Sequence, residues 1–428
     1  MKVLVLSSAA WSDDNCFGNS FSNLFEGMEE LEIANIACRA GRPTEKLVTR
    51  CFQITEKSLL NNLKSKANPS GREIQIPPEN LKDTQQEDFP LRKFGQKKRW
   101  QILFWGRDLI WAAGRWKSPE LMRFLDDFGP DLIFQPIYEA GYLNDIAQYI
   151  KAYTKAPMIG YISDDCYTLK RLSFSPLYWL DRLHKRKKVN QTIEQCELLY
   201  VISRIQQEEY AQCFSVDCKV LTKHADFDAA PALKKSYHHP LQLVYTGNIG
   251  TNRWKSLKII ADVLESINEK GIRAQLRIYT ATPLSKKMKK ALARGESSLL
   301  MGSVSAGIVP ELQRNADILV HVEPLDLKHK LMVRHSFSTK IVDYLKAARP
   351  ILAVGPKDVA SIDHLIRNEC AIAAEHKAEL ERKLRDILRD TEALETLAVN
   401  AYKCGGNHHN RRVLQTMLRQ DMERISRG

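Results

Sequence analysis

Short apolar runs alternate with longer amphipathic stretches along most of this chain. The first apolar run covers residues 2–8, and a polar loop with Gly18 and an amphipathic stretch over 20–29 follow it. Short apolar runs bounded by turn residues are typical of buried parallel strands, and stretches with helical spacing are typical of the helices that cover them. Further apolar runs lie at 131–135, 158–163, 198–202 and 219–221. The pattern predicts consecutive βαβ units, and therefore an α/β domain that is doubly wound.

A second series of the same kind begins after residues 229–240, a segment with two prolines that predicts a linker. Its strands are expected at 241–246, 275–279, 299–301, 318–322 and 351–354. The region from 376 to 428 is charged and rich in helical spacing. We therefore predict an N-terminal domain over 1–228 with a variable polar insertion at 57–98, a C-terminal domain over 241–405, and a terminal helix over 406–428 that crosses back.

Residues 335–356 combine a polar loop, a short helix, a proline and an apolar strand. The candidate N-caps of the helix are Ser336, Ser338 and Thr339. A helix that starts near Lys340 directs free backbone N–H groups and a partial positive charge toward the preceding loop, which suits a phosphate. Lys340 adds a full charge, and Asp343 follows on the same helix face, where a carboxylate can accept two hydrogen bonds from a vicinal diol. Phosphate next to ribose indicates a nucleotide.

The same residues also fit a plain capping box, in which an acid follows the capping Ser or Thr by three residues. Asp343 lies four residues after Thr339 and five after Ser338. The spacing disfavours the capping box, but both interpretations stay open on the residues alone.

The segment resembles the signature of GT-B glycosyltransferases of the family 4-like kind. In that family a Lys precedes an acid that holds the ribose, and small residues, a proline and an apolar strand follow. The matching positions are Lys340, Asp343, Ala347, Ala348, Pro350 and residues 351–354. Two positions depart from the pattern: Asp343 replaces the usual Glu, and His335 stands where retaining members often carry a second Glu. The resemblance implies two doubly wound domains that face each other across a cleft, with the donor site in the second.

The strand expected at 241–246 leads into a loop with two glycines, which let a backbone approach a phosphate. In the resembling family this turn supplies an Arg and a Lys to the donor diphosphate. Asn248 stands where that Arg commonly follows the glycine, so we assign these catalytic roles to Arg253 and Lys255, together with Lys340. The donor-binding candidates are Gly247, Asn248, Gly250, His335, Ser338, Thr339, Lys340 and Asp343.

Acidic residues follow two of the expected N-terminal strands. Asp164 and Asp165 come after the run at 158–163, and Glu139 follows the run at 131–135. Ligands bind at the carboxyl ends of parallel strands, so these acids are candidates for the acceptor side, and Asp164 for catalysis. A helix cap or a turn is the plain alternative. Gly18 joins the acceptor-side candidates because the first loop of the resembling enzymes lies along the interdomain cleft.

The chain of 428 residues has a formal charge of +13, which implies an anionic partner. Residues 92–117 hold eight of the basic residues, a single acid and four tryptophans. Such a segment suits an anionic membrane surface, although a solvated basic helix with its rings in the core is the alternative. Nine cysteines without a Cys-x-x-Cys pair indicate reduced thiols, and no apolar run is long enough to span a membrane. We expect a cytoplasmic protein that can attach to the membrane peripherally.

The resemblance implies transfer of a sugar from a nucleoside-diphosphate sugar to an acceptor hydroxyl, without an obligatory metal or other cofactor. A glycan or lipid-linked acceptor in polysaccharide or glycolipid synthesis is expected. His335 and Asn248 leave open a non-catalytic protein that binds nucleotide sugars or acts as a scaffold. A nucleic-acid partner has only the net charge in its favour and is not expected.

Overall fold

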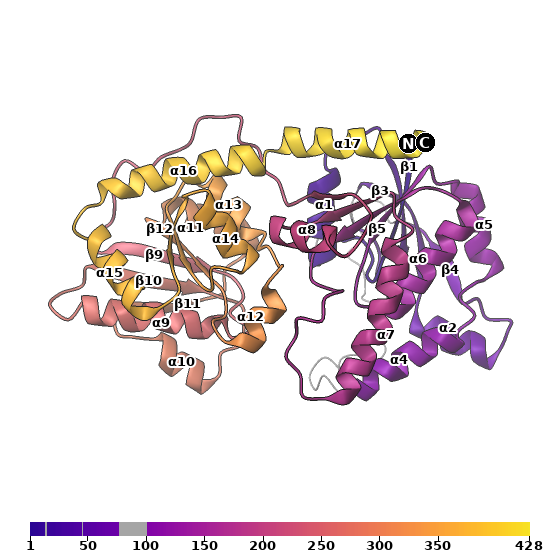
Figure 1. The fold of residues 1–428 in the computed structure, drawn as a ribbon, viewed down its shortest axis with the longest axis horizontal. Coiled ribbons are helices and arrows are strands. Elements are labelled where there is room, and N and C mark those ends of the chain that lie inside the picture. The colour runs from indigo at the N-terminus through magenta and orange to yellow at the C-terminus, as the bar shows by residue number, and fades with distance from the viewer. Residues whose placement is uncertain (13–14, 45, 77–100) are drawn as a thin grey trace.

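Two α/β domains make up the molecule, each built on one sheet (Figure 1). The computed structural model describes residues 1–12, 15–44, 46–76 and 101–428. Within these residues, all strand pairs are parallel except β3 with β4 at one edge of the first sheet. The prediction of two doubly wound domains is confirmed.

The first sheet has the order β4-β3-β2-β1-β5-β6-β7-β8. Its strands are β1 Lys2–Ser7, β2 Glu32–Ala37, β3 Val48–Ile54, β4 Gly71–Ile74, β5 Leu132–Pro136, β6 Met158–Ile162, β7 Leu198–Val201 and β8 Cys218–Val220. Its helices are α1 Cys16–Phe25, α2 Glu56–Lys64, α4 Gln101–Ala113, α5 Pro119–Phe128, α6 Gly141–Thr154, α7 Pro176–Ile193 and α8 Arg204–Ala211. The order reverses between β1 and β5, which creates a switch point at the carboxyl ends of these strands.

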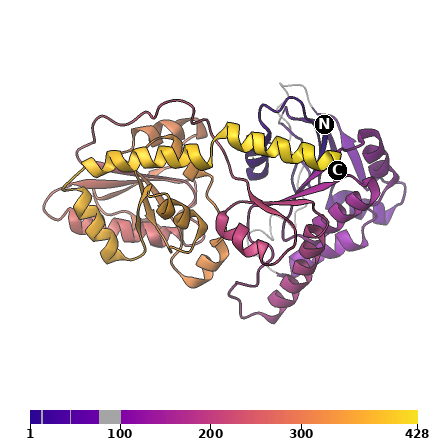
Figure 2. The same cartoon turned by 45° about the horizontal axis from the view of Figure 1, so that its top comes forward.

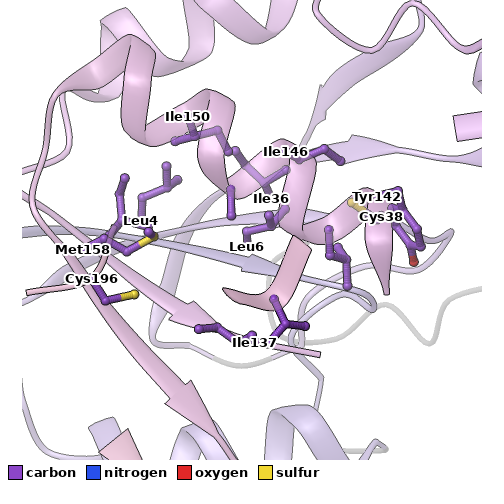
Figure 3. Close-up of a cluster of buried hydrophobic side chains, with 14 of the residues drawn as sticks. Leu4, Leu6, Ile36, Cys38, Ile137, Tyr142, Ile146, Ile150, Met158 and Cys196 are labelled. Atoms are coloured by element: carbon purple, nitrogen blue, oxygen red, sulfur yellow. The ribbon is translucent and has the colours of Figure 1, made fainter. Parts of the chain in front are cut away.

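Both faces of this sheet are covered, because successive side chains of a strand point to opposite faces. Leu4 and Leu6 of β1 belong to the core under α5 and α6, which Figure 3 shows with Ile146 and Ile150. Val3 and Val5 belong to the core on the other face, with residues of α1 and α17. A strand that is buried on both sides appears in the sequence as a continuous apolar run, which is why residues 2–8 were predicted to form a strand.

The second sheet has the order β11-β10-β9-β12-β13-β14, with its switch point between β9 and β12. Its strands are β9 Leu241–Thr246, β10 Ala274–Tyr279, β11 Ser298–Gly302, β12 Ile318–Val322, β13 Ile351–Val354 and β14 Ala371–Ala374. The helices are α9 Arg253–Ile267, α10 Lys286–Leu292, α11 Val309–Asn315, α12 Leu327–Val333, α13 Lys340–Lys346, α14 Ala360–Arg367, α15 Lys377–Ile387, α16 Glu392–His408 and α17 Arg411–Arg427, with a 3₁₀ turn at Ala306–Ile308.

The last two helices connect the domains. α16 packs on the second domain and α17 lies along the first, as the yellow helices of Figures 1 and 2 show. The Gln415 side chain donates to the carbonyl oxygen of Glu26 at 2.7 Å, and the Tyr200 hydroxyl donates to Asp421 at 2.7 Å. The chain end is therefore part of the N-terminal core.

Several segments differ from the sequence prediction, among them α1, which was predicted at 20–29 and begins at Cys16. Part of the expected insertion at 57–98 is regular, because Thr55 and Ser58 form a capping box that starts α2, and β4 adds to the sheet edge. Residues 77–98 lie outside the described part of the chain. Helix α7 was not predicted, since its buried side carries Arg182 and Lys185 while several leucines lie on its exposed side.

The tryptophans expected at a membrane surface have different environments. Trp111 and Trp116 are buried in the N-terminal core, where Trp111 stacks on Tyr142 at 4.4 Å, so neither can enter a bilayer. Trp105 is partly exposed. The rest of the candidate segment, residues 92–100, lies outside the described residues. Within the described part of the chain, no helix combines the length and the apolar character that crossing a membrane requires.

Candidate functional site

A cavity of about 780 Å³ lies between the two domains. It is lined by residues that follow the carboxyl ends of β5 and β6 in the first domain and of β9 and β12 in the second, and by the loop before α13. The lining residues are Ile137, Tyr138, Glu139, Asp164, Asp165, Cys166, Arg171, Gly247, Asn248, Thr251, Arg253, His321, Val322, Glu323, Met332, Val333, Ser336, Phe337, Ser338, Thr339 and Lys340. Both switch points therefore open toward the same space, which is where sheets of this type bind ligands.

Lys340 lies against Gly247 on the donor side of the cavity, which is the side formed by the second domain. Its ammonium donates to the carbonyl oxygen of Thr246 at 3.1 Å and lies 4.8 Å from the ring centre of Tyr245. Gly247 has φ +138, and a Cβ atom there would lie 2.3 Å from the Lys340 ammonium. A side chain at position 247 would be strained at this φ and would have to displace the Lys340 ammonium. Burial, with Arg253 nearby, lowers the pKa of Lys340 to about 8, although Glu323 and Asp343 oppose the shift.

Arg253 forms the second cation of the donor side. It makes a two-pronged contact with Glu323, with Nε 3.0 Å from Oε2 and Nη2 3.3 Å from Oε1. Glu323 is almost completely buried, and burial raises its pKa although Arg253 and Lys340 oppose the shift. Beneath it, His321 Nε2 lies 3.0 Å from the Ser361 hydroxyl, and burial keeps the pKa of His321 well below its usual range. The donor side of the cavity thus holds two cations, Lys340 and Arg253, next to the buried Glu323 carboxylate.

The rest of the loop after β9 forms a tight turn. The Asn248 side chain accepts from the amide of Gly250 at 2.6 Å, so it closes the turn. Gly250 and Lys255 do not line the cavity, and Lys255 is exposed near the ring of Trp254. Of the two cations nominated from this loop, the structure places Arg253 in the cavity and Lys255 outside it.

The start of α13 differs from the predicted cap. Thr339 occupies the N-cap position with helical φ and ψ and makes no side-chain capping bond. Ser338 and Thr339 line the cavity, but Asp343 does not. Asp343 instead lies 2.6 Å from the ammonium of Lys223, which comes from the first domain. A ribose ligand at Asp343 would therefore have to share or replace this partner.

Residues 334–336 join the second domain to the first. Arg334 and His335 both donate to Glu209 of α8, at 2.5 and 2.7 Å, and the Ser336 hydroxyl donates to Asp164 at 2.6 Å. Although burial opposes the shift, hydrogen bonds from Arg334 and Lys170 lower the pKa of Glu209 to about 2. His335 is completely buried and does not line the cavity. Its position favours a role in interdomain contact over donor binding.

The acidic candidates of the first domain have separate environments. Asp164 is exposed in the cavity, where it faces Ser336. Asp165 is buried and accepts hydrogen bonds from the amides of Tyr167 and Thr168 and from the Thr168 hydroxyl. It therefore stabilises a turn, which was the alternative to a role on the acceptor side. These bonds with Thr168 outweigh the cost of burial and hold the pKa of Asp165 below its ordinary value.

A buried arginine supports these acids. Arg182 of α7 is fully buried, with Nη1 2.5 Å from Glu139 and Nη2 2.7 Å from the carbonyl oxygen of Thr168. It fixes the loop that presents Asp164. Nothing in the sequence distinguishes Arg182 from the surrounding basic residues 184–188, so sequence reasoning missed it.

Two further sequence features lie outside the cavity. Gly18 packs in α1 against the preceding loop, where a Cβ atom would lie 1.9 Å from the carbonyl oxygen of Ser12. The Asp-x-Asp triplet at 226–228 lies in the interdomain connection, and Asp228 accepts from Asn410 and Arg412. Neither feature contributes a group to the cavity described above.

Comparison with known proteins gives structural matches only. No protein-family model matches the chain, and neither does any curated protein. HepE from Anabaena in complex with UDP superposes with a TM-score of 0.65 at 11% identity, and the match covers 99% of this chain and 100% of HepE. A glycosyltransferase from Rickettsia africae gives 0.60 at 11% identity, covering 99% and 98%. The N-terminal domain of trehalose-6-phosphate phosphatase from Candida albicans gives 0.62 at 12%, covering 99% and 97%. The chain therefore has the GT-B fold of glycosyltransferases.

Proposed function

We propose that this protein transfers a glycosyl group from a nucleoside-diphosphate sugar to an acceptor hydroxyl. The main support for this proposal is the interdomain cavity. Lys340 and Arg253 line it from the second domain, and the carboxylate of Asp164 lines it from the first. HepE, which has the same fold, has been observed with UDP and with UDP-glucose. A fold does not fix an activity, so the proposal rests on these side chains.

The two cations suit the departure of a diphosphate. As the glycosidic bond breaks, negative charge grows on the leaving oxygen, and prepositioned cations in a poorly solvated site stabilise that charge most at the transition state. Lys340 and Arg253 would fill this role, with Gly247, Asn248, Ser338 and Thr339 around the phosphates. We therefore propose transfer without an obligatory metal.

Asp164 is the proposed acceptor-side group. A carboxylate that faces the cavity can accept the proton of an attacking hydroxyl, provided that Ser336 gives up its hydrogen bond to Asp164. We propose a glycan or lipid-linked acceptor, and a cytoplasmic protein that works at the membrane. Glu139, held by Arg182 at the cavity wall, would contact the acceptor without serving as the base.

Asp343 offers a direct test of ribose binding. If Asp343 holds the ribose diol, Asp343→Asn should weaken binding of the nucleoside diphosphate about tenfold, because one of two acceptors becomes a donor. Lys223→Met is the matched control, since it removes the same ion pair from the other partner. Isothermal titration of both variants separates the two roles. Equal losses in both variants would assign Asp343 to the domain contact instead.

The pKa of Lys340 predicts proton uptake on donor binding. In the free protein Lys340 loses its proton as the pH rises through about 8. A bound diphosphate favours the ammonium, so above that pH the protein should take up protons as it binds, and affinity should fall. Calorimetry at about pH 9 in buffers of different ionisation enthalpy measures this uptake. It should disappear in Lys340→Met, and uptake that persists there would assign it to another group.

The same pKa affects stability in the opposite direction. Lys340 has a lower pKa in the folded protein than the 10.5 of an exposed lysine, so between about 8 and 10.5 the unfolded chain binds more protons. The contribution of Lys340 to the free energy of unfolding therefore rises with pH in this window. Weaker donor binding at high pH could therefore not be attributed to a destabilisation of the folded protein through Lys340.

A ligand panel tests the proposal. Thermal melting with nucleoside diphosphates and with duplex DNA should show stabilisation by at least one diphosphate and none by DNA. Stabilisation by DNA alone would contradict the proposal. Binding of a nucleotide sugar without hydrolysis or transfer would favour the second candidate, a non-catalytic binding protein. That candidate is favoured by His335, which stands where retaining members of the resembling family often carry a second Glu and which here contacts Glu209 of α8.

A further inference from the structure

Half of the large apolar side chains that are exposed in the described residues lie on one flank of the N-terminal domain. Sixteen such side chains are exposed in all, and eight belong to α4, α7 and the loop between β6 and α7. These eight are Trp105, Leu109, Leu169, Leu172, Phe174, Leu177, Leu180 and Leu183, which we name the α7 apolar face. Phe174 is 95% exposed and Leu180 is 63% exposed. Exposed apolar side chains that gather on neighbouring elements mark an interaction site.

The members of this face on α4 and α7 lie together in space. The Trp105 indole donates to Asp181 of α7 at 3.1 Å, and Trp105, Leu109 and Leu180 line one shallow surface hollow. Leu177, Leu180 and Leu183 have the helical spacing of a single exposed side of α7. Figures 1 and 2 show the amino end of α7 at the margin of the molecule, preceded by the loop that carries Phe174.

The positive charge of the same segment indicates that its partner is anionic. Residues 169–188 contain seven lysines and arginines and one acid, Asp181. Of these cations, Arg182 and Lys185 are buried, and Lys170 and Lys188 form ion pairs with Glu209 and Asp145. Lys187 is exposed on the side of α7 that carries the leucines. Apolar side chains that project outward among basic residues suit a bilayer with anionic lipids, since the rings and leucines enter the headgroup region while the cations remain at the surface.

We propose that the α7 apolar face docks on an anionic lipid bilayer. The loop that carries Phe174 also lines the interdomain cavity through Asp164 and Arg171. Docking there would set the acceptor side of the cavity close to the bilayer surface. The proposed surface shares Trp105 and Leu109 with the segment 92–117 and takes its other members from residues 169–183. Vesicle binding needs no nucleotide sugar, so its failure would leave the proposed glycosyl transfer untouched and would remove only the proposed work at the membrane.

The test is co-sedimentation with vesicles of phosphatidylcholine and phosphatidylglycerol, compared with phosphatidylcholine alone. The parent protein should bind the mixed vesicles, and salt should weaken the binding without abolishing it. The variant Phe174→Ser, Leu177→Ser and Leu180→Ser should bind at least about tenfold more weakly. Val413→Ser, which is 60% exposed on α17, is the matched control and should bind as the parent does.

A second pair of variants tests the charge. Lys187→Glu should weaken binding to the mixed vesicles about fivefold or more, while Lys287→Glu, at a position on α10 that is also exposed, should not. Because these side chains are exposed, the melting temperature should stay unchanged in every variant. Several results would overturn the proposal: no binding by the parent, equal binding by the triple variant, a lowered melting temperature that indicates a face covered by the chain itself, or a parent dimer that the triple variant dissociates.

Discussion

Arg253→Met is expected to lower the free energy of unfolding by about 3 kcal/mol at neutral pH, because it leaves the buried Glu323 carboxylate without its cation. The loss should be smaller at low pH. Without Arg253 the pKa of Glu323 rises further above that of the unfolded chain, so stability falls as the pH rises from the unfolded pKa to the folded one. Urea unfolding at several pH values measures this dependence. Lys258→Met, which breaks a surface ion pair on the same helix, should cost less than about 1 kcal/mol.

The double variant Arg253→Met with Glu323→Gln separates structure from catalysis. Removing the buried charge as well should recover most of the lost stability. Turnover of the donor should stay about a hundredfold or more below the parent, since the cation at the diphosphate is still missing. A double variant that regains both stability and activity would show that Arg253 only neutralises Glu323.

Lys340→Met is expected to lower kcat/KM by about a hundredfold to a thousandfold without lowering the melting temperature. Its ammonium is poorly solvated and lies against Gly247, so its charge should act strongly on a diphosphate, whereas its removal costs the fold little. Lys346 lies on the same short helix and its side chain is exposed, so Lys346→Met should keep full activity. A Lys340→Met enzyme within threefold of the parent would remove Lys340 from the mechanism.

The fold was predictable because strands buried on both faces leave apolar runs in the sequence. β9 and β12 have the predicted bounds, and the loop after β9 was recognised from Gly247. Helix α7 was not predictable by the same rule. Its buried positions hold Arg182 and Lys185, and its apolar side chains face outward, so periodicity alone gives no core-facing stripe.

The site was predictable only as far as local sequence determines it. Lys340 follows from motif position, whereas Arg253 was assigned because Asn248 stands where the Arg of the motif is expected, and both line the cavity. The surroundings of Asp343 and His335 depend on Lys223 and Glu209, each more than a hundred residues earlier in the chain. No local pattern could show that Asp343 is paired across the domains or that His335 is buried against α8. Such long-range partners decide which of several polar residues in a loop face the ligand.

The central claim, glycosyl transfer in this cavity, is tested most directly by donor turnover. Nucleoside-diphosphate sugars of different base and sugar are incubated with the purified protein, and release of the nucleoside diphosphate is followed for the parent, Lys340→Met and Lys346→Met. We expect release from at least one donor with the parent and with Lys346→Met, and little with Lys340→Met. If no donor is consumed, or if Lys340→Met consumes it at the parental rate, the proposed site is contradicted.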